Sequence, residues 1–76
     1  MPYYRVTVRG DPTRASGLLG LAGIENVVAG PRDPHAPGRT LIARLPADNG
    51  ELAVQRVRAA LMDDAFNVDD YARQEP

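Results

Sequence analysis

Residues 40–61 read Thr-Leu-Ile-Ala-Arg-Leu-Pro-Ala-Asp-Asn-Gly-Glu-Leu-Ala-Val-Gln-Arg-Val-Arg-Ala-Ala-Leu, and two different periodicities follow each other within this stretch. Residues 40–45 alternate, with Leu41, Ala43 and Leu45 on one side, and this is typical of a half-buried strand. After Pro46 the apolar residues recur at helical spacing, at Ala53, Val54, Val57, Ala60 and Leu61. The stretch therefore predicts a strand followed by an amphipathic helix.

The ends of this helix are marked by charged residues. Asp48 and Glu51 have the spacing of a capping box, with Asp in place of the usual Ser or Thr. Asp63 and Asp64 follow the apolar stripe, and acidic groups there oppose the helix dipole. We expect the helix to begin near Asp48 and to stop or fray at Asp63.

The N-terminal part of the chain repeats the same order. Tyr4, Val6 and Val8 alternate with polar neighbours over residues 3–9, which predicts a strand that Gly10 ends. Asp11 followed by Pro12 favours a helix start, because Asp caps free amides and Pro fits the first turn. Helical spacing then predicts a buried face made of Ala15, Leu18, Leu19 and Ala22, with Gly23 as a C-terminal stop.

Two shorter strands complete the pattern. Residues 24–29 predict a second strand, and residues 30–38 predict a long loop because three prolines interrupt them. Phe66 and Val68 suggest a fourth strand that runs to Tyr71, followed by a flexible tail at 72–76. The 76 residues are expected to form one domain with a thin core, which self-association would enlarge.

This strand-helix-strand, strand-helix-strand order resembles the ferredoxin-like α/β plait. The resemblance implies an α+β fold with a four-stranded antiparallel sheet in the spatial order 4-1-3-2. It also implies that both helices cover one face and leave the other open. That open face would carry Tyr3, Arg5, Thr7 and Arg9 beside Thr40, Ile42 and Arg44. We expect a homodimer through this face or an edge strand, with an interface of Tyr3, Arg5, Thr7, Arg9, Ile42 and Arg44.

Two families within that fold are similar to parts of the chain. Residues 9–12 (Arg-Gly-Asp-Pro) and 22–27 (Ala-Gly-Ile-Glu-Asn-Val) resemble ACT regulatory domains, which commonly dimerise and bind amino acids near the first turn. This resemblance implies a ligand site at Gly10, Asp11 and Asn26. Length and element order are also similar to subtilisin propeptide-like inhibitors, in which a C-terminal tail, here residues 71–76, enters the protease.

Composition argues against catalysis and against metal or cofactor sites. The chain has no Cys, one Ser (Ser16) and one His (His35), and these two are predicted in a helix and in the proline-rich loop. We therefore expect no nucleophile and base pair, and no enzyme activity. The acids at 63, 64, 69 and 70 match no Ca²⁺ loop, so no metal and no cofactor is expected.

Charge is distributed unevenly along the chain. All nine basic residues are arginines; residues 1–46 hold six against three acids (+3), and residues 47–76 hold three against seven (−4), which gives the net −1. This balance makes nucleic acid an unlikely partner, although Tyr3 with Arg5, Arg9 and Arg44 offers a thin surface for single-stranded RNA. No apolar run is long enough to span a bilayer and no leader is expected, so we predict a cytoplasmic binding or regulatory module.

Overall fold

The computed structural model describes residues 1–30, 40–62 and 66–74. The elements follow in the order β1 (Tyr3–Arg9), α1 (Pro12–Leu21), β2 (Val27–Ala29), β3 (Thr40–Pro46), α2 (Gly50–Leu61) and β4 (Asn67–Gln74). The sequence therefore predicted the class and order of these elements correctly: an α+β chain with two helices and an antiparallel sheet. Most of the expected proline-rich loop, including His35, lies outside the described residues.

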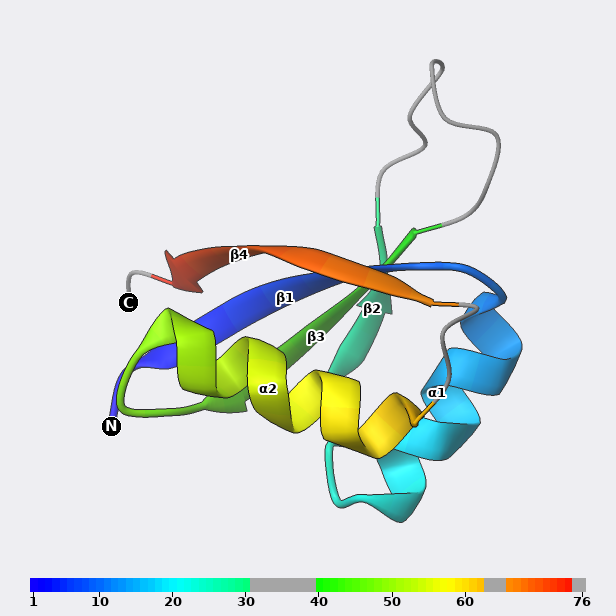
Figure 1. The fold of residues 1–76 in the computed structure, drawn as a ribbon, viewed down its shortest axis with the longest axis horizontal. Coiled ribbons are helices and arrows are strands. Elements are labelled where there is room, and N and C mark those ends of the chain that lie inside the picture. The colour runs from blue at the N-terminus through cyan, green and yellow to red at the C-terminus, as the bar shows by residue number, and fades with distance from the viewer. Residues whose placement is uncertain (31–39, 63–65, 75–76) are drawn as a thin grey trace.

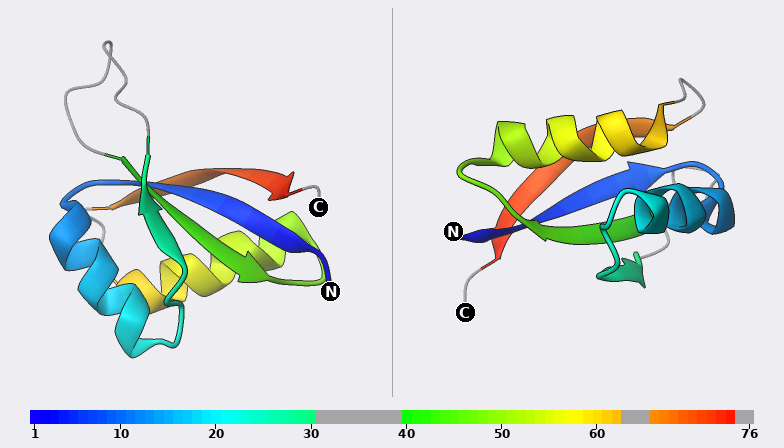
Figure 2. Two further views of the ribbon diagram at one scale, coloured as in Figure 1. Left: turned by 180° about the vertical axis from the view of Figure 1, so that it is seen from behind. Right: turned by 90° about the horizontal axis from the view of Figure 1, so that it is seen from below.

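The four strands form one sheet in the order β2-β3-β1-β4, and each neighbouring pair is antiparallel. Strands β1 and β3 lie in the middle of the sheet, and β2 and β4 form its edges (Figure 1). Both helices contribute to the same core on one side of the sheet, and the strands lie in front of α2 when the molecule is viewed from behind (Figure 2). In the part of the chain that the structure describes, no helix lies over the opposite side of the sheet.

The core lies between the helices and the covered side of the sheet. Alternation along β1 and β3 points one set of small aliphatic side chains inward, and the helices supply the facing set. The buried residues are Val6, Val8, Ala15, Leu19, Leu41, Ala43, Leu45, Ala47, Ala53, Val54, Val57, Leu61 and Val68. The aliphatic stripes predicted for β1, β3 and α2 are thus confirmed, with Tyr4 and Ala60 partly buried against this cluster.

Helix α1 begins and ends nearly as its sequence predicts. Asp11 is the N-cap, and its Oδ1 accepts hydrogen bonds from the amides of Thr13 (3.1 Å) and Arg14 (3.4 Å). Gly23 adopts φ +84°, a conformation that other residues rarely adopt, just after the helix. Ala22, expected on the buried face, is an exposed C-cap instead, because the helix ends at Leu21.

Helix α2 is capped by a different residue from the one predicted. Asn49 is its N-cap, and the Asn49 Oδ1 accepts a hydrogen bond of 2.9 Å from the Leu52 amide. Asp48 lies one position too early to reach the same amide, so the capping box predicted with Glu51 is wrong. The helix ends at Leu61 with Met62 as a left-handed C-cap at φ 52°, close to the predicted stop.

Two strand boundaries also differ from the prediction. Strand β2 starts at Val27 and not at residue 24. Strand β4 continues to Gln74, where Ala72, Arg73 and Gln74 pair with Arg5, Tyr4 and Tyr3 of β1. A flexible tail beginning at residue 72 is therefore wrong for residues 72–74, and the inhibitor-like tail at 71–76 is largely part of the sheet; residues 75–76 lie outside the described residues.

Candidate functional site

The structure does not bring the ACT-like residues Gly10, Asp11 and Asn26 together. Val27 is paired with Ala43, and Ala43 is paired with Val6. Asn26, one residue before Val27, therefore lies near the start of β1. Gly10 and Asp11 follow the last residue of β1, at its other end. The Asp11 carboxylate is also occupied by capping α1. Within one copy of the chain, these residues do not form one site.

The predicted open face is confirmed by the strand register. Residues directly opposite each other in an antiparallel pair share a side of the sheet. Arg5 is opposite Arg44, Thr7 is opposite Ile42, and Arg9 is opposite Thr40. The edge strands add five residues to this side that the sequence pattern did not place there: Val28, Asn67, Asp70, Ala72 and Gln74.

Arg5 and Arg44 form the most unusual pair on this face. The Arg44 amide donates to the Asn26 carbonyl (2.9 Å), so the backbone of Arg44 is turned toward β2 and away from β1. Arg5 and Arg44 are therefore a non-hydrogen-bonded pair, the type in which side chains lie closest. Like charges directly opposite each other destabilise a sheet. Ala72 is the neighbour of Arg5 on the other side and offers no compensating charge.

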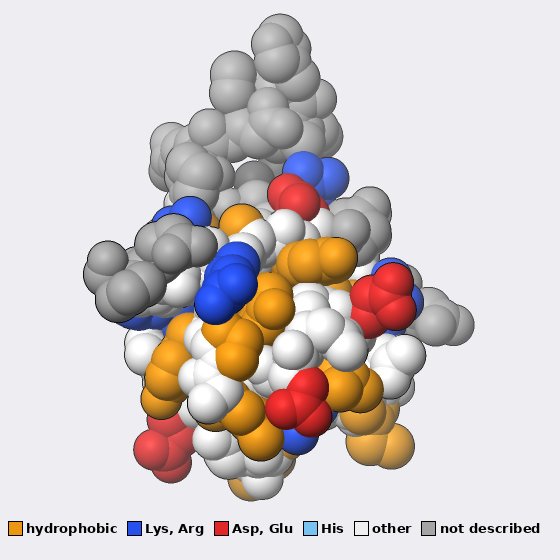
Figure 3. Space-filling view, turned by 90° about the vertical axis from the view of Figure 1, so that its left-hand side faces the viewer, with side chains coloured by type: hydrophobic (Ala, Val, Ile, Leu, Met, Phe, Trp, Pro, Cys, Tyr) orange, Lys and Arg blue, Asp and Glu red, His pale blue; other side chains and the backbone are white. Residues whose placement is uncertain are grey.

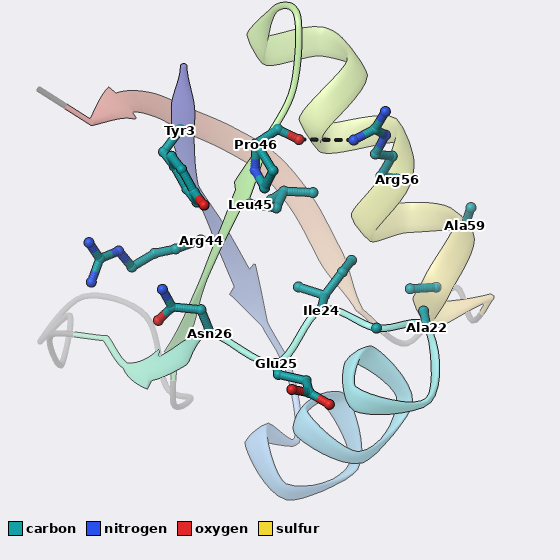
Figure 4. A pocket seen from close by; sticks show the side chains of 12 residues that line it. Tyr3, Ala22, Ile24, Glu25, Asn26, Arg44, Leu45, Pro46, Arg56 and Ala59 are labelled. Atoms are coloured by element: carbon teal, nitrogen blue, oxygen red, sulfur yellow. Dashed lines mark hydrogen bonds between the residues drawn. The ribbon is translucent and has the colours of Figure 1, made fainter. Parts of the chain in front are cut away.

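A hydrogen bond across the open face fixes the position of Arg44. Its Nε donates to Oε1 of Gln74 at 2.7 Å. Because β1 lies between β3 and β4, this bond passes over β1. It leaves the two Nη groups of Arg44 without a partner among the described residues. Figure 4 shows the Tyr3 ring and the Asn26 amide on the same side as the Arg44 side chain.

Three hollows meet at Arg44, which lines each of them. The largest, about 770 Å³, runs from Tyr3 past residues 22–26 to the second half of α2. A second, about 510 Å³, lies between the N-terminus and Gln74. The third, about 460 Å³, lies on the open face and is lined by Arg5, Val28, Ile42, Arg44, Arg73 and Gln74. This third hollow, called the arginine hollow below, combines the cations of Arg5 and Arg44 with the aliphatic side chains of Val28 and Ile42.

The two arginines of α2 donate hydrogen bonds to backbone carbonyls. Arg56 Nη1 donates to the Pro46 carbonyl (2.9 Å), which is also drawn in Figure 4. Arg58 Nε donates to the Val68 carbonyl (2.9 Å). At the end of the molecule that holds both termini, the described charged side chains of both signs are scattered among hydrophobic ones (Figure 3). The arginines of the open face are set apart by their position, because Arg5 and Arg44 lie directly opposite each other.

The remaining candidates for chemistry form no site among the described residues. Ser16 is half-buried in α1, and His35 lies outside the described residues. Within residues 1–30, 40–62 and 66–74, no three His, Cys, Asp or Glu side chains are close enough to hold a metal ion. Neither helix in this part of the chain has the length and apolar character needed to cross a membrane.

No protein-family model, no curated protein and no solved structure matches this chain. The arginine pair and the hollow on the open face are therefore the features from which a function can be inferred.

Proposed function

We propose that the chain is a small non-catalytic binding domain with a ferredoxin-like plait, and that its open sheet face binds a partner that carries carboxylates. The observation that supports this proposal best is the adjacent pair Arg5 and Arg44. The two cations lie side by side with no carboxylate among the described residues to neutralise them. An acidic partner would supply the missing charge, and arginine suits carboxylates because its donors match both oxygens.

The same charges disfavour the open face as a contact between two copies. A two-fold interface joins the same patch on both copies, so it would bring together two faces on which the described arginines outnumber the described carboxylate. Asp70, opposite Thr7, is the carboxylate that the described part of β4 places on this face, and Asp70 lies two residues from the arginine row. An acidic partner therefore fits better than a second copy.

Binding of a labelled hexaglutamate peptide at low ionic strength tests the proposal. Replacing Arg5 or Arg44 by Gln should weaken binding about fivefold or more, as expected for one lost charge-assisted hydrogen bond. Arg9→Gln is the matched control, because Arg9 is on the same strand and face but outside the arginine hollow. Equal losses in all three variants would contradict a special role of the Arg5 and Arg44 pair, and unchanged binding in all three would contradict binding at the open face. A single-stranded oligouridylate that bound more tightly than hexaglutamate would contradict the choice of a carboxylate partner.

Edge strand β4 supports self-association as a second candidate. Its eight residues pair with β1 on one side only, so the other side offers backbone groups to another strand. Since Arg5 turns its backbone toward β4, the amides of Tyr71 and Arg73 point outward. Hydrogen exchange at these two amides should slow as protein concentration rises, while Ala72 stays protected throughout. A monomer at all concentrations by sedimentation would overturn this second function.

A further inference from the structure

We propose that the arginine hollow is a specific site for an organic acid, a carboxylate attached to a short aliphatic body. This inference rests on the proposed function and names the chemistry that the open face would recognise. It assigns the carboxylate to Arg5 and Arg44 and the aliphatic body to Val28 and Ile42. The hollow is about 460 Å³, within the roughly 300–1,000 Å³ typical of sites for small ligands.

The position of the ligand's carboxylate follows from the hydrogen bond that Arg44 makes within the protein. Gln74 holds Arg44 through its Nε, so the guanidinium is oriented before a ligand arrives. Its Nη groups and the adjacent Arg5 guanidinium remain available to two carboxylate oxygens. Because Gln74 is neutral, it positions Arg44 without cancelling the charge that attracts the ligand.

The aliphatic position follows from the next row of the sheet. Val28 lies directly opposite Ile42, and this row is two residues from the arginine row on the same side. Val28 is 47% exposed and Ile42 is half-buried, so both side chains present apolar surface at the floor of the hollow. A ligand with a few methylene groups would cover this surface while its carboxylate stays at the arginines.

Calorimetric titration with sodium hexanoate, sodium acetate and inorganic phosphate tests the site. Hexanoate should bind several-fold more tightly than acetate, because only hexanoate reaches the aliphatic pair. Arg44→Gln and Arg5→Gln should each weaken hexanoate binding about tenfold, whereas Arg9→Gln should leave it within about twofold. Ile42→Thr should reduce the preference for hexanoate over acetate. Far-ultraviolet circular dichroism checks that each variant is folded.

Three results would overturn the proposal. The assignment of Val28 and Ile42 to the aliphatic body is contradicted if hexanoate binds no better than acetate. It is also contradicted if phosphate binds as tightly as hexanoate. Equal hexanoate affinity in the wild type and in Arg44→Gln removes the arginine part. The hexaglutamate experiment separates the two levels of the argument. If hexanoate fails to bind but Arg44→Gln still weakens hexaglutamate binding, the proposed ligand class is wrong and the proposed function stands. If Arg44→Gln changes the binding of neither hexanoate nor hexaglutamate, the ligand class and the proposed function are both wrong.

Discussion

The ring of Tyr71 on β4 occupies the space into which a Cβ on Gly50, the first residue of α2, would project. The ring is also held by an edge contact with Tyr4, with ring centroids 6.2 Å apart. Gly50 thus allows α2 to start directly against the aromatic side chain of the edge strand. This contact ties α2 to the strand that carries Arg73 and Gln74.

Gly50→Ala should lower the free energy of unfolding by about 1–3 kcal/mol, because the added methyl group overlaps the ring. In a Tyr71→Ala background the same substitution should be close to neutral, so a double-mutant cycle measured by urea unfolding would show the coupling. Gly17→Ala is the control, since no atom lies within 4 Å of its added Cβ. An equal cost of Gly50→Ala in both backgrounds would contradict the contact.

The Arg5 and Arg44 pair predicts a stabilising substitution. Arg5→Gln should raise the free energy of unfolding by about 0.2–1 kcal/mol at low salt, because it removes a like charge from directly opposite Arg44. The gain should fade as salt is added, since exposed charges are screened. Arg9→Gln should show no gain, as Arg9 lies opposite Thr40. A loss of stability in Arg5→Gln at low salt would argue against repulsion between the two arginines.

Gln74→Glu places a carboxylate where a neutral amide now accepts from Arg44. We expect it to raise the free energy of unfolding by up to about 1 kcal/mol, the usual range for a partly exposed ion pair. The new carboxylate should also compete with external anions and weaken hexanoate binding. Unfolding and titration of the same variant check both effects. A variant that gained stability yet bound hexanoate as well as the wild type would place the ligand away from Arg44.

The two candidate caps of α2 are separated by a pair of substitutions. Asn49→Ala should lower the free energy of unfolding by about 1 kcal/mol, because it removes the acceptor for the Leu52 amide. Asp48→Ala should cost much less, since Asp48 is exposed and Asn49 is the N-cap. Thermal unfolding of the two variants is sufficient to compare them. The reverse order of stabilities would restore the capping box expected from the sequence.

Most of the fold could be predicted because the spacing of apolar residues along the chain indicates which side chains are buried. The alternation in β1 and β3 and the stripe in α2 predict these elements correctly, since their inward residues are all apolar. The end of β4 gave no such signal. Ala72, Arg73 and Gln74 belong to an edge strand, and the single apolar residue among them, Ala72, is exposed. No buried apolar residue therefore distinguishes this segment from a tail.

The site was only partly predictable for a related reason. Arg5 and Arg44 were placed on one face from alternation alone. Whether they lie directly opposite each other depends on the register of β1 with β3, which is a long-range property of the pairing. The hydrogen bond from Arg44 to Gln74 depends on where β4 ends, which the sequence does not indicate. The ligand site that the family resemblance implies at Gly10, Asp11 and Asn26 is not formed, because Asn26 and Gly10 lie at opposite ends of β1.

The most direct test of the account is an NMR titration with hexanoate that follows the side-chain Nε–Hε resonances of the arginines. The account predicts that the resonances of Arg5 and Arg44 shift together and saturate with one affinity, while those of Arg9 and Arg58 stay in place. Arg58 is a useful reference because its Nε already donates to Val68. Shifts that spread evenly over all four arginines, or that spare Arg5 and Arg44, would contradict the account.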